Sequence, residues 1–250
     1  MSTPLLEVRG VSIAFDLIQV LDELSLSLQP HELRFLIGPN GAGKTTLLDV
    51  ISGKTRPHSG HVIFDGHDAL RTPAHRLAHL GMARKFQTPA VFTSLTVRHN
   101  LEAAGSYHER GLDLLLPARA RISEKVDEVI HTIGLTAQAG TPAGVLSHGQ
   151  QQWLEIGMLL MLSPKLLLLD EPVAGLTRAE RDRTSELLHN IRNAAILIVE
   201  HDMAFVRQFD AAVTVLHQGR VLVEGPMATV QRDERVIEVY LGRAPETDAA

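Results

Sequence analysis

The chain has 250 residues, 44% hydrophobic and 21% charged, which is the composition of an ordinary globular protein with enough material for a core. Its net charge of −5 argues against nucleic acid as the main partner, and the absence of cysteine excludes a disulfide framework or a cysteine-based metal site. The start of the chain lacks the pattern of a signal peptide. The most apolar stretch, residues 157–169, is interrupted by Ser163, Pro164 and Lys165, so we expect no membrane-spanning segment.

The N-terminal third alternates apolar and polar residues as strands do. Leu6 and Val8, and later the three leucines within residues 24–28, point to one face of a predicted sheet. Residues 61–66 predict a further strand that ends in the Asp-Gly turn signal.

Residues 33–37 form a short apolar run that predicts a buried strand, and an apolar helix follows at residues 46–51. The eight residues between position 37 and position 46 fit the pattern G-x-x-x-x-G-K-[ST]. In this context the glycines let backbone amides converge on a phosphate, and the helix N-terminus adds the positive end of its dipole. Lys44 can reach the β- and γ-phosphates of a nucleotide, and the Thr45 hydroxyl can ligate Mg²⁺. The predicted nucleotide contacts here are Gly38, Pro39, Asn40, Gly41, Ala42, Gly43, Lys44, Thr45 and Thr46.

From about residue 72 to residue 150 the pattern is helical. A helix is predicted over residues 123–133, with Ser123 near its start and four apolar residues at helical spacing. Another apolar helix is predicted over residues 150–162.

The stretch Leu-Ser-His-Gly-Gln opens this second helix and predicts a second anion site. Ser147, Gly149 and Gln150 surround the helix N-terminus, where the dipole favours negative charge. One nucleotide cannot easily use two separate loops of this kind in one chain. The economical interpretation is that each loop closes over the nucleotide of another subunit.

The C-terminal hundred residues alternate strands and helices. Strands are predicted at residues 166–169 and 196–199, with an amphipathic helix at residues 179–191 between them. A hairpin is predicted around the Gln-Gly pair at 218–219, and the tail at residues 243–250 has little to bury and is expected to be disordered.

Three polar residues follow these buried strands, at the sheet edge where α/β proteins bind ligands. Asp170 can hold a hydrated Mg²⁺, and Glu171 can orient a water in line with the γ-phosphate or act as its base. His201 follows the later strand and is placed to contact the γ-phosphate. Taken alone, the acid pair is better interpreted as a solvated strand end and the histidine as a structural residue. Taken together with the phosphate loop, all three are better interpreted as parts of a nucleotide site.

Together these motifs resemble the ATP-binding subunits of ABC transporters, over residues 5–242. The resemblance implies an α/β fold: a P-loop NTPase core of the RecA type, with an N-terminal antiparallel β subdomain and an α-helical subdomain inserted at about residues 88–150. It implies one such domain over residues 5–242 and ATP hydrolysis with Mg²⁺. The Walker A loop is then Gly38–Thr46, the Walker B strand is Leu166–Asp170, and the signature motif is Leu146–Gln150.

The same resemblance assigns single residues. Glu171 is the catalytic glutamate and His201 the switch histidine. Gln87 matches the glutamine that contacts Mg²⁺ and links the core to the helical subdomain. Phe15 matches the aromatic residue that stacks on adenine, with an ordinary strand-end core residue as the alternative.

Three positions depart from the family pattern. His148 replaces the usual glycine of the signature, Thr177 stands where an aspartate is frequent, and His31 occupies a turn position where glycine is common. His148 faces the partner's nucleotide in the family arrangement, so it either adds a hydrogen bond or charge or is merely tolerated. Thr177 puts the usual contact across the dimer in doubt.

Several short stretches outside the general motifs resemble the branched-chain amino acid uptake branch of this family. They are residues 53–57, 153–157, 171–175, 200–203 and 236–242. Within that branch, the Lys-Thr-Arg-Pro run, the Ser-His-Gly-Gln signature and Gly-Leu-Thr at 175–177 look most like the urea-type subunit. The resemblance implies import of urea or short-chain amides, with branched-chain amino acid uptake as the alternative. It also implies a second ATPase subunit, identical or different, transmembrane permeases, a periplasmic solute-binding protein, and a location on the inner face of the plasma membrane.

Three other readings are open from the sequence. One is an ATPase that exports a lipid such as lipopolysaccharide, which would differ in its permeases. Another is a non-transport regulatory clamp on ribosomes or DNA, which the single ATPase domain and the acidic charge disfavour. The third is a partner that binds ATP without hydrolysing it, which the joint presence of Lys44, Gln87, Asp170, Glu171 and His201 argues against.

Overall fold

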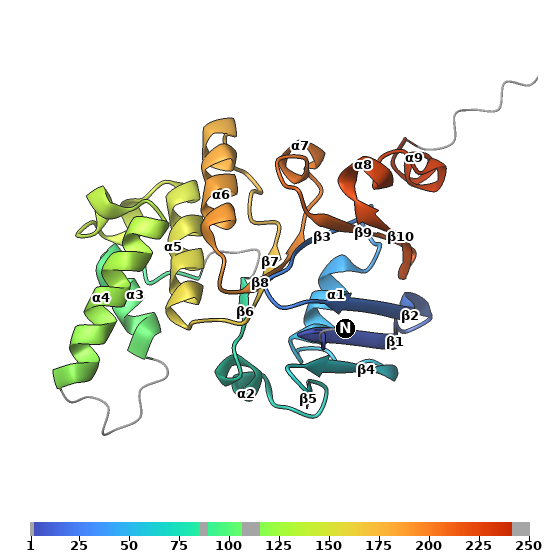
Figure 1. The fold of residues 1–250 in the computed structure, drawn as a ribbon, viewed down its shortest axis with the longest axis horizontal. Helices are drawn as coiled ribbons and strands as arrows, with labels where there is room; N and C mark the ends of the chain where they lie inside the picture. Colours follow the sequence, from blue (N-terminus) through green and yellow to red (C-terminus); the bar gives the residue numbers. More distant parts are fainter. Residues whose placement is uncertain (1–2, 86–89, 107–115, 242–250) are drawn as a thin grey trace, which may run out of the picture. The chain divides into compact units, whose positions relative to one another are not determined.

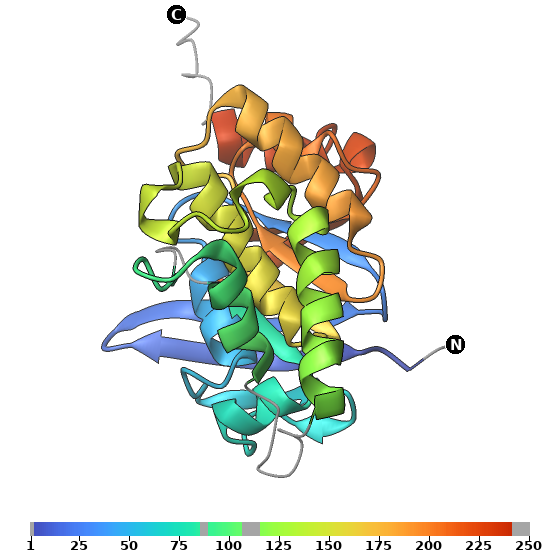
Figure 2. The ribbon, with the colours of Figure 1, turned by 90° about the vertical axis from the view of Figure 1, so that its left-hand side faces the viewer.

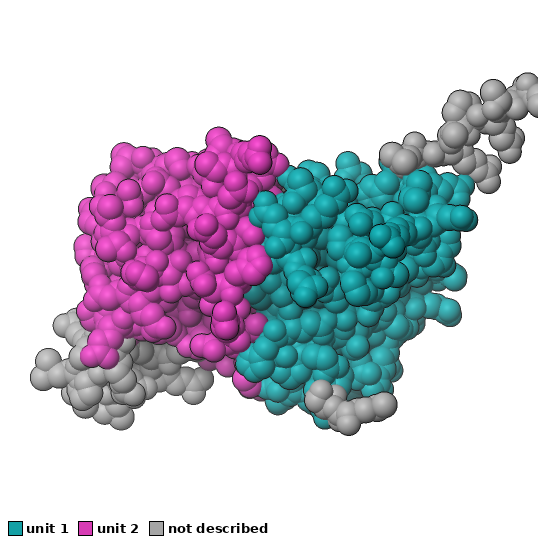
Figure 3. All heavy atoms as spheres, turned by 45° about the horizontal axis from the view of Figure 1, so that its top comes forward, with its two compact units in different colours: residues 1–74, 195–250 teal, residues 75–194 magenta. Residues whose placement is uncertain are grey.

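A computed structural model describes residues 3–85, 90–106 and 116–241. The chain divides into two compact units, coloured separately in Figure 3. Unit 1 comprises residues 1–74 and 195–250, and unit 2 comprises residues 75–194. Unit 2 contains the stretch predicted as a helical insertion, residues 88–150, together with strands and helices on either side of it.

Unit 1 contains an antiparallel sheet with the strand order β2-β1-β4-β5 (Figure 1). Its strands are β1 (Leu6–Phe15), β2 (Ile18–Leu28), β4 (Ser59–Phe64) and β5 (His67–Asp68). The predicted alternation is confirmed, because Leu6 and Val8 on β1 face the core with Leu24, Leu26 and Leu28 on β2. The turn predicted at Asp65-Gly66 is also present, with both residues at positive φ.

The second group of strands in unit 1 surrounds β3 (Leu33–Ile37). This strand runs parallel to β8 (Ala195–Val199) on one side and to β9 (Ala212–His217) on the other. Both faces of such a strand are covered, which explains the unbroken apolar run of β8 and the apolar run of β3, broken only by Arg34. β10 (Arg220–Pro226) pairs antiparallel with β9 and completes the predicted hairpin.

Four helices belong to unit 1. They are α1 (Lys44–Ile51), α7 (Met203–Val206), α8 (Met227–Val230) and α9 (Glu234–Leu241). Phe35 on β3 meets Phe205 and Phe209 in edge-to-face contacts, with 5.1 Å between the ring centroids of Phe35 and Phe209. These contacts fix α7 and the turn after it against β3.

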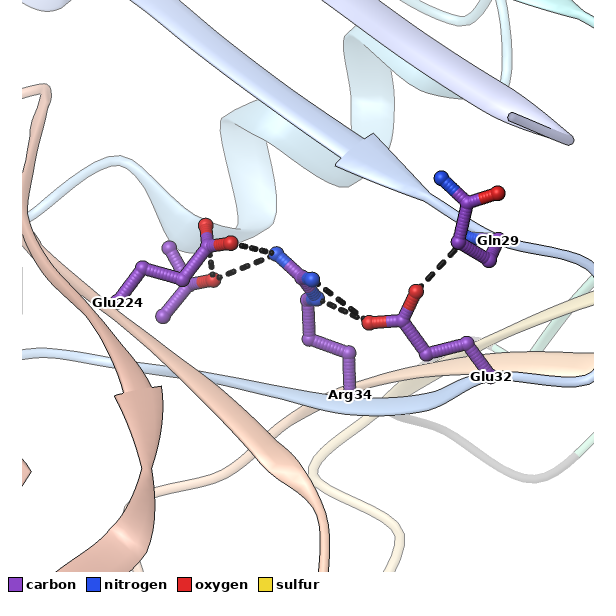
Figure 4. Close-up of polar contacts among 5 residues, drawn as sticks. Gln29, Glu32, Arg34 and Glu224 are labelled. Carbon is purple, nitrogen blue, oxygen red and sulfur yellow. Dashed lines mark hydrogen bonds and ion pairs between the residues drawn. The ribbon is translucent and has the colours of Figure 1, made fainter. Parts of the chain in front are cut away.

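An ion network around the buried Arg34 ties the start of β3 to the hairpin. The Arg34 guanidinium is 2.7 Å from a carboxylate oxygen of Glu32 and 2.7 Å from one of Glu224, which lies on β10 (Figure 4). Thr214 on β9 completes the group by donating to Glu224. The planar guanidinium satisfies two carboxylates at once, one just before β3 and one on β10, which a lysine could not do with the same geometry.

Unit 2 pairs two parallel strands, β6 (Met82–Lys85) and β7 (Leu166–Asp170). Its helices are α2 (Ala74–His79), which starts at the boundary, α3 (Val97–Gly105), α4 (Leu116–Thr132), α5 (His148–Met161) and α6 (Arg178–Asn190). The helices α3, α4 and α5 pack against one another, as Figure 2 shows. Val126, Ile130 and Ile133 bury one side of α4 and its end, as their helical spacing predicts.

Two details differ from the expectations. β6 lies in the stretch expected to be helical, because four residues that include two basic side chains carry no strand pattern. α4 starts at Leu116 and not near Ser123, and Pro117 in its first turn suits that start. The predicted disorder of residues 243–250 concerns a segment outside the described residues. Across the described ranges, no helix is long and apolar enough to cross a membrane.

Candidate functional site

The predicted phosphate loop leaves β3 at its buried end and leads into α1. Gly38 has a φ of 153°, and a Cβ at this position would overlap the carbonyl oxygen of Leu216. Gly43 has a φ of 98°, and its Cβ would lie 2.7 Å from the Val20 carbonyl oxygen. Only glycine meets both demands, so the chain needs glycine where the motif places it.

Lys44 curls back over this loop. The residue is buried, and its Nζ donates to the carbonyl oxygens of Gly38 at 2.7 Å and of Pro39 at 3.0 Å. The ammonium group therefore sits at the mouth of the loop, where a phosphate would meet it. Thr45, the next residue, has an exposed side chain at the N-terminus of α1.

The hairpin turn of β9 and β10 supports the loop from behind. Gly219 donates its N–H to Ala42 O at 3.2 Å, and its own carbonyl accepts from Asp22 N at 3.0 Å. Arg220 pairs with Asp22 at 2.6 Å and holds the turn to β2. The loop is thus tied to elements more than a hundred residues away in the sequence.

His201 lies at the same sheet edge as the phosphate loop. β3 and β8 are parallel with Leu36 opposite Val199, so Gly38 and His201 each lie two residues beyond this pair, at the ends of neighbouring strands. Glu200 is buried and its Oε2 accepts the N–H of His201 at 3.1 Å, which fixes the backbone there. The His201 side chain is exposed. Unit 1 therefore brings together the loop and the histidine, as the strand positions predict.

Phe15 ends β1 and is 50% exposed, so the alternative of a core residue does not hold. It pairs with Ile18 across the hairpin, and β2 then reaches the phosphate loop through the contact between Val20 and Gly43. An exposed aromatic ring on this hairpin is available for stacking.

Tyr240 is a contact to the loop that sequence reasoning missed. It lies on α9, and its hydroxyl oxygen accepts the backbone N–H of Gly38. Burial raises the pKa of Tyr240 to about 12, partly offset by that N–H, so the phenol stays protonated at neutral pH. No short motif marks Tyr240, because its contact joins α9 to the phosphate loop, which lies far away in the sequence.

In unit 2, β7 carries the acid pair. All five residues of β7 are buried, including Asp170, which is 1% exposed. Glu171 follows in a left-handed conformation with a φ of 47°, and its carbonyl oxygen accepts Ala174 N at 3.2 Å to form a turn. A glutamate rarely adopts this backbone conformation, and such residues concentrate at functional sites.

The signature stretch forms the N-terminus of α5. Ser147 is the N-cap: its Oγ accepts Gln150 N at 3.2 Å, and its own N–H donates to Gln150 Oε1 at 3.0 Å. This reciprocal pair is a capping box, which the spacing S-x-x-Q announces in the sequence. Ser147 is exposed and Gly149 is buried.

Two of the three departures from the family pattern, His148 and Thr177, lie on this stretch and on the loop after β7. The His148 ring lies over Gly175, and its Nε2 is 2.9 Å from Gln152 Nε2. Thr177 caps α6 in a second capping box, in which Glu180 accepts from the Thr177 N–H and hydroxyl at 3.0 and 2.9 Å. Glu180 was not predicted as a site residue, although the spacing T-x-x-E would have marked it.

The predicted site residues thus fall into two groups. Unit 1 holds Gly38–Thr46, Phe15 and His201, and unit 2 holds Asp170, Glu171 and the signature. Gln87 lies outside the described residues. Among those described, no three histidine or acidic residues gather as a metal site of their own. The donors present, a threonine hydroxyl and a carboxylate, are hard oxygen ligands that suit Mg²⁺ bound together with phosphates.

This fold and loop define a P-loop nucleotide-binding protein of the α/β class. Residues 21–174 match the ABC transporter family, and residues 220–246 match the family described as branched-chain amino acid ATP-binding cassette transporter. The chain is 34% identical to the high-affinity branched-chain amino acid transport ATP-binding proteins BraF of Pseudomonas aeruginosa and LivG of Escherichia coli K12. Each alignment covers 98% of this chain and 100% of the relative.

Solved structures agree with this match. MJ1267, described as an ATP-binding cassette of an ABC transporter, superimposes with a TM-score of 0.84 at 28% identity, covering 96% of this chain and all of that one. Its ADP conformation gives a TM-score of 0.81 at 29% identity and the same coverage. The chain belongs to the ABC transporter family and is a transport ATPase of its ATP-binding cassette class, within the branched-chain amino acid branch.

Proposed function

We propose that this chain is the energising subunit of a solute importer, binding MgATP in the loop Gly38–Thr46 and hydrolysing it with Glu171. The conformation of that loop carries the proposal, because Lys44 donates to the carbonyls of Gly38 and Pro39 while a Cβ at Gly38 or Gly43 would clash with neighbouring backbone. Phe15 stacks on the adenine, and His201 contacts the γ-phosphate from the neighbouring strand end. Thr45, Asp170 and Gln87 hold the Mg²⁺, which neutralises phosphate charge.

In this proposal Glu171 orients the attacking water. Its carboxylate follows a buried strand directly, and its left-handed backbone turns the side chain away from the strand direction. The water attacks the γ-phosphorus in line, the bond to the β-phosphate oxygen breaks, and ADP and phosphate leave.

Residues 5–242 act as one ATPase domain with a helical insertion at about residues 88–150. Two ATPase subunits, identical or different, enclose two ATP molecules, each between one chain's phosphate loop and the other chain's Ser147, Gly149 and Gln150. The pair sits on the inner face of the plasma membrane beneath two transmembrane permeases, which receive solute from a periplasmic binding protein.

The solute favoured by the comparisons is a branched-chain amino acid. Curated relatives along nearly the whole chain carry that name, and the C-terminal segment matches the corresponding family. Urea or a short-chain amide is the second candidate. It is supported only by the amino-acid sequence of the signature and of residues 53–57 and 175–177. The test is uptake of labelled leucine and labelled urea by cells with and without this gene. Loss of urea uptake alone would replace the first candidate with the second.

The catalytic role is tested with Glu171→Gln in the assembled transporter. We expect ATP affinity within about threefold of wild type and turnover reduced by about 10² or more, the range for losing a general base. Glu124→Gln, which removes an exposed acid from α4, is the matched control and should leave both unchanged. Wild-type turnover in Glu171→Gln would contradict the assignment.

A further inference from the structure

One carboxylate in unit 2 links the starts of two helices. Glu180 lies in the first turn of α6, and its Oε2 accepts the N–H and hydroxyl of Thr177, the N-cap of that helix. Its other oxygen, Oε1, accepts the Ser147 hydroxyl at 3.2 Å, thirty-three positions earlier in the chain. Glu180 therefore uses both oxygens, one toward each helix start.

The single proton of the Ser147 hydroxyl is used by these contacts. Its oxygen accepts the N–H of Gln150 to cap α5, and its proton goes to Glu180. A serine hydroxyl has a single proton to donate. While Glu180 holds it, Ser147 has none to offer to another acceptor.

The surroundings keep the carboxylate in place and charged. A Cβ at position 149 would lie 2.5 Å from Glu180 Oε1, so Gly149 makes room for the carboxylate beside the signature. Hydrogen bonds from Thr177, then from Ser147, and the nearby His148 lower the pKa of Glu180, so it is ionised at neutral pH. Gln152 adds a second link by donating to Ala174 O at 3.3 Å.

A nucleotide phosphate and a carboxylate are both acceptors without protons at neutral pH, so they cannot share one hydroxyl proton. We propose that Glu180 sets the affinity for the partner's nucleotide by competing with its terminal phosphate for the single proton of Ser147 Oγ. The inference rests on the proposed function, in which Ser147 closes over the nucleotide of a partner subunit. Engagement of that nucleotide then requires the Ser147 proton to turn from Glu180 to the phosphate.

The structure offers a conservative variant that separates this role from folding. Glu180→Gln keeps an oxygen for Thr177, because glutamine serves in capping boxes as glutamate does. Only one of its two terminal atoms is an acceptor, so the atom facing Ser147 becomes an amide donor and no longer takes the serine proton. Glu186→Gln is the matched control, since it neutralises an exposed acid on the same helix.

In the assembled transporter, we expect Glu180→Gln to lower the KM for ATP by about threefold to tenfold, the span of one hydrogen bond, without raising kcat. Glu186→Gln should leave both constants unchanged. An unchanged or raised KM in Glu180→Gln would overturn the inference.

Combining Glu180→Gln with a second substitution shows which residue and which nucleotide the change in affinity depends on. With Ser147→Ala present, Glu180→Gln should no longer change the KM, because there is no hydroxyl proton to release. With Lys44→Ala in the chain that carries Glu180→Gln and an unaltered partner subunit, displacement of bound trinitrophenyl-ATP should still show the tighter affinity, because the remaining nucleotide is held by the partner's phosphate loop. Persistence of the effect without Ser147, or its loss without Lys44, would overturn the inference.

Ser147→Ala alone distinguishes failure of the role inferred for Glu180 from failure of the proposed contact between Ser147 and the partner's nucleotide. A raised KM in Ser147→Ala with no response to Glu180→Gln contradicts the role of Glu180 alone. An unchanged KM in Ser147→Ala contradicts the proposed contact of Ser147 with the partner's nucleotide, and the role of Glu180 with it.

Discussion

Single residues in the phosphate loop obey demands that come from the backbone around them. At Gly38 the neighbour is the carbonyl group of Leu216 on β9, which is fixed in a sheet and cannot give way. At Gly66 the φ is also positive, at 76°, but nothing lies near the missing side chain. Position 38 thus requires glycine because there is no space for a side chain, whereas position 66 favours glycine only because of its positive φ.

We expect Gly38→Ala to lose far more stability than Gly66→Ala. The positive φ alone costs an alanine about 1–2 kcal/mol at either position, and overpacking against the sheet adds about 1–3 kcal/mol at position 38. Urea denaturation of both variants measures the difference, and ATP binding should fail only in Gly38→Ala. Equal losses would show that the Leu216 carbonyl does not constrain the loop.

The sequence predicts the identity of these residues better than their geometry. The motif predicts a loop between β3 and α1 because its residue types serve one conformation, and strand counting predicts His201 at the same sheet edge; their roles toward a nucleotide stay predictions. The left-handed backbone of Glu171 is not marked by a glycine or asparagine, and the contact of Tyr240 with Gly38 joins segments far apart in the sequence, so neither was predicted.

At the scale of elements, capping boxes start α5 and α6, and the spacings S-x-x-Q and T-x-x-E that form them can be recognised in the sequence. The buried strands β7 and β8 are predicted equally well by their unbroken apolar runs, and β3 by a run broken only by Arg34, because parallel strands covered on both faces need apolar residues. β6 is not predicted, since its four residues carry no such run and only pairing with β7 makes them a strand.

β6 is also joined to α5 by a buried ion pair. Lys85 Nζ is 3.6 Å from Glu155 Oε2, and the two side chains are 0% and 6% exposed. Burial raises the pKa of Glu155, while Lys85 and the N–H of Ala90 oppose that rise. A raised carboxyl pKa favours the folded state below about pH 4.5, and that contribution is lost as the pH rises through the folded-state value.

We expect Lys85→Met to destabilise unit 2 by about 3 kcal/mol at neutral pH, because it leaves the buried Glu155 charge without its cation. The loss should shrink toward pH 4, where Glu155 is protonated and no charge is stranded. Chemical denaturation at both pH values measures this. Lys85→Met combined with Glu155→Leu is the control and should recover most of the stability. A loss that does not change with pH would contradict this explanation.

At the scale of the whole molecule, composition and motif order suffice for the fold class, and the structural comparisons confirm it. The solute does not follow from the same residues, because the groups that bind the nucleotide are common to the family. The division at residues 75 and 194 was not predicted, since it follows packing density and no change in composition marks it.

The intact chain should gain stability from ATP. A ligand that binds only the folded state at 100 times its Kd contributes about 2.7 kcal/mol, and for a chain of this size that raises the Tm by about 5 °C or more. Lys44→Ala should abolish the shift with Mg²⁺ and ATP. Lys54→Ala, which changes an exposed lysine after α1, should preserve it. Scanning calorimetry decides, and an undiminished shift in Lys44→Ala would place ATP elsewhere.

The turn between β9 and β10 has a practical consequence for anyone who labels this protein. Hairpin tips are usually the first choice for inserting an epitope or a fluorophore, because extra residues there disturb little. Here Gly219 is buried and bonded on one side to Ala42 and on the other to Asp22. An insertion at this tip would reach straight into the nucleotide loop, so a probe belongs on another surface.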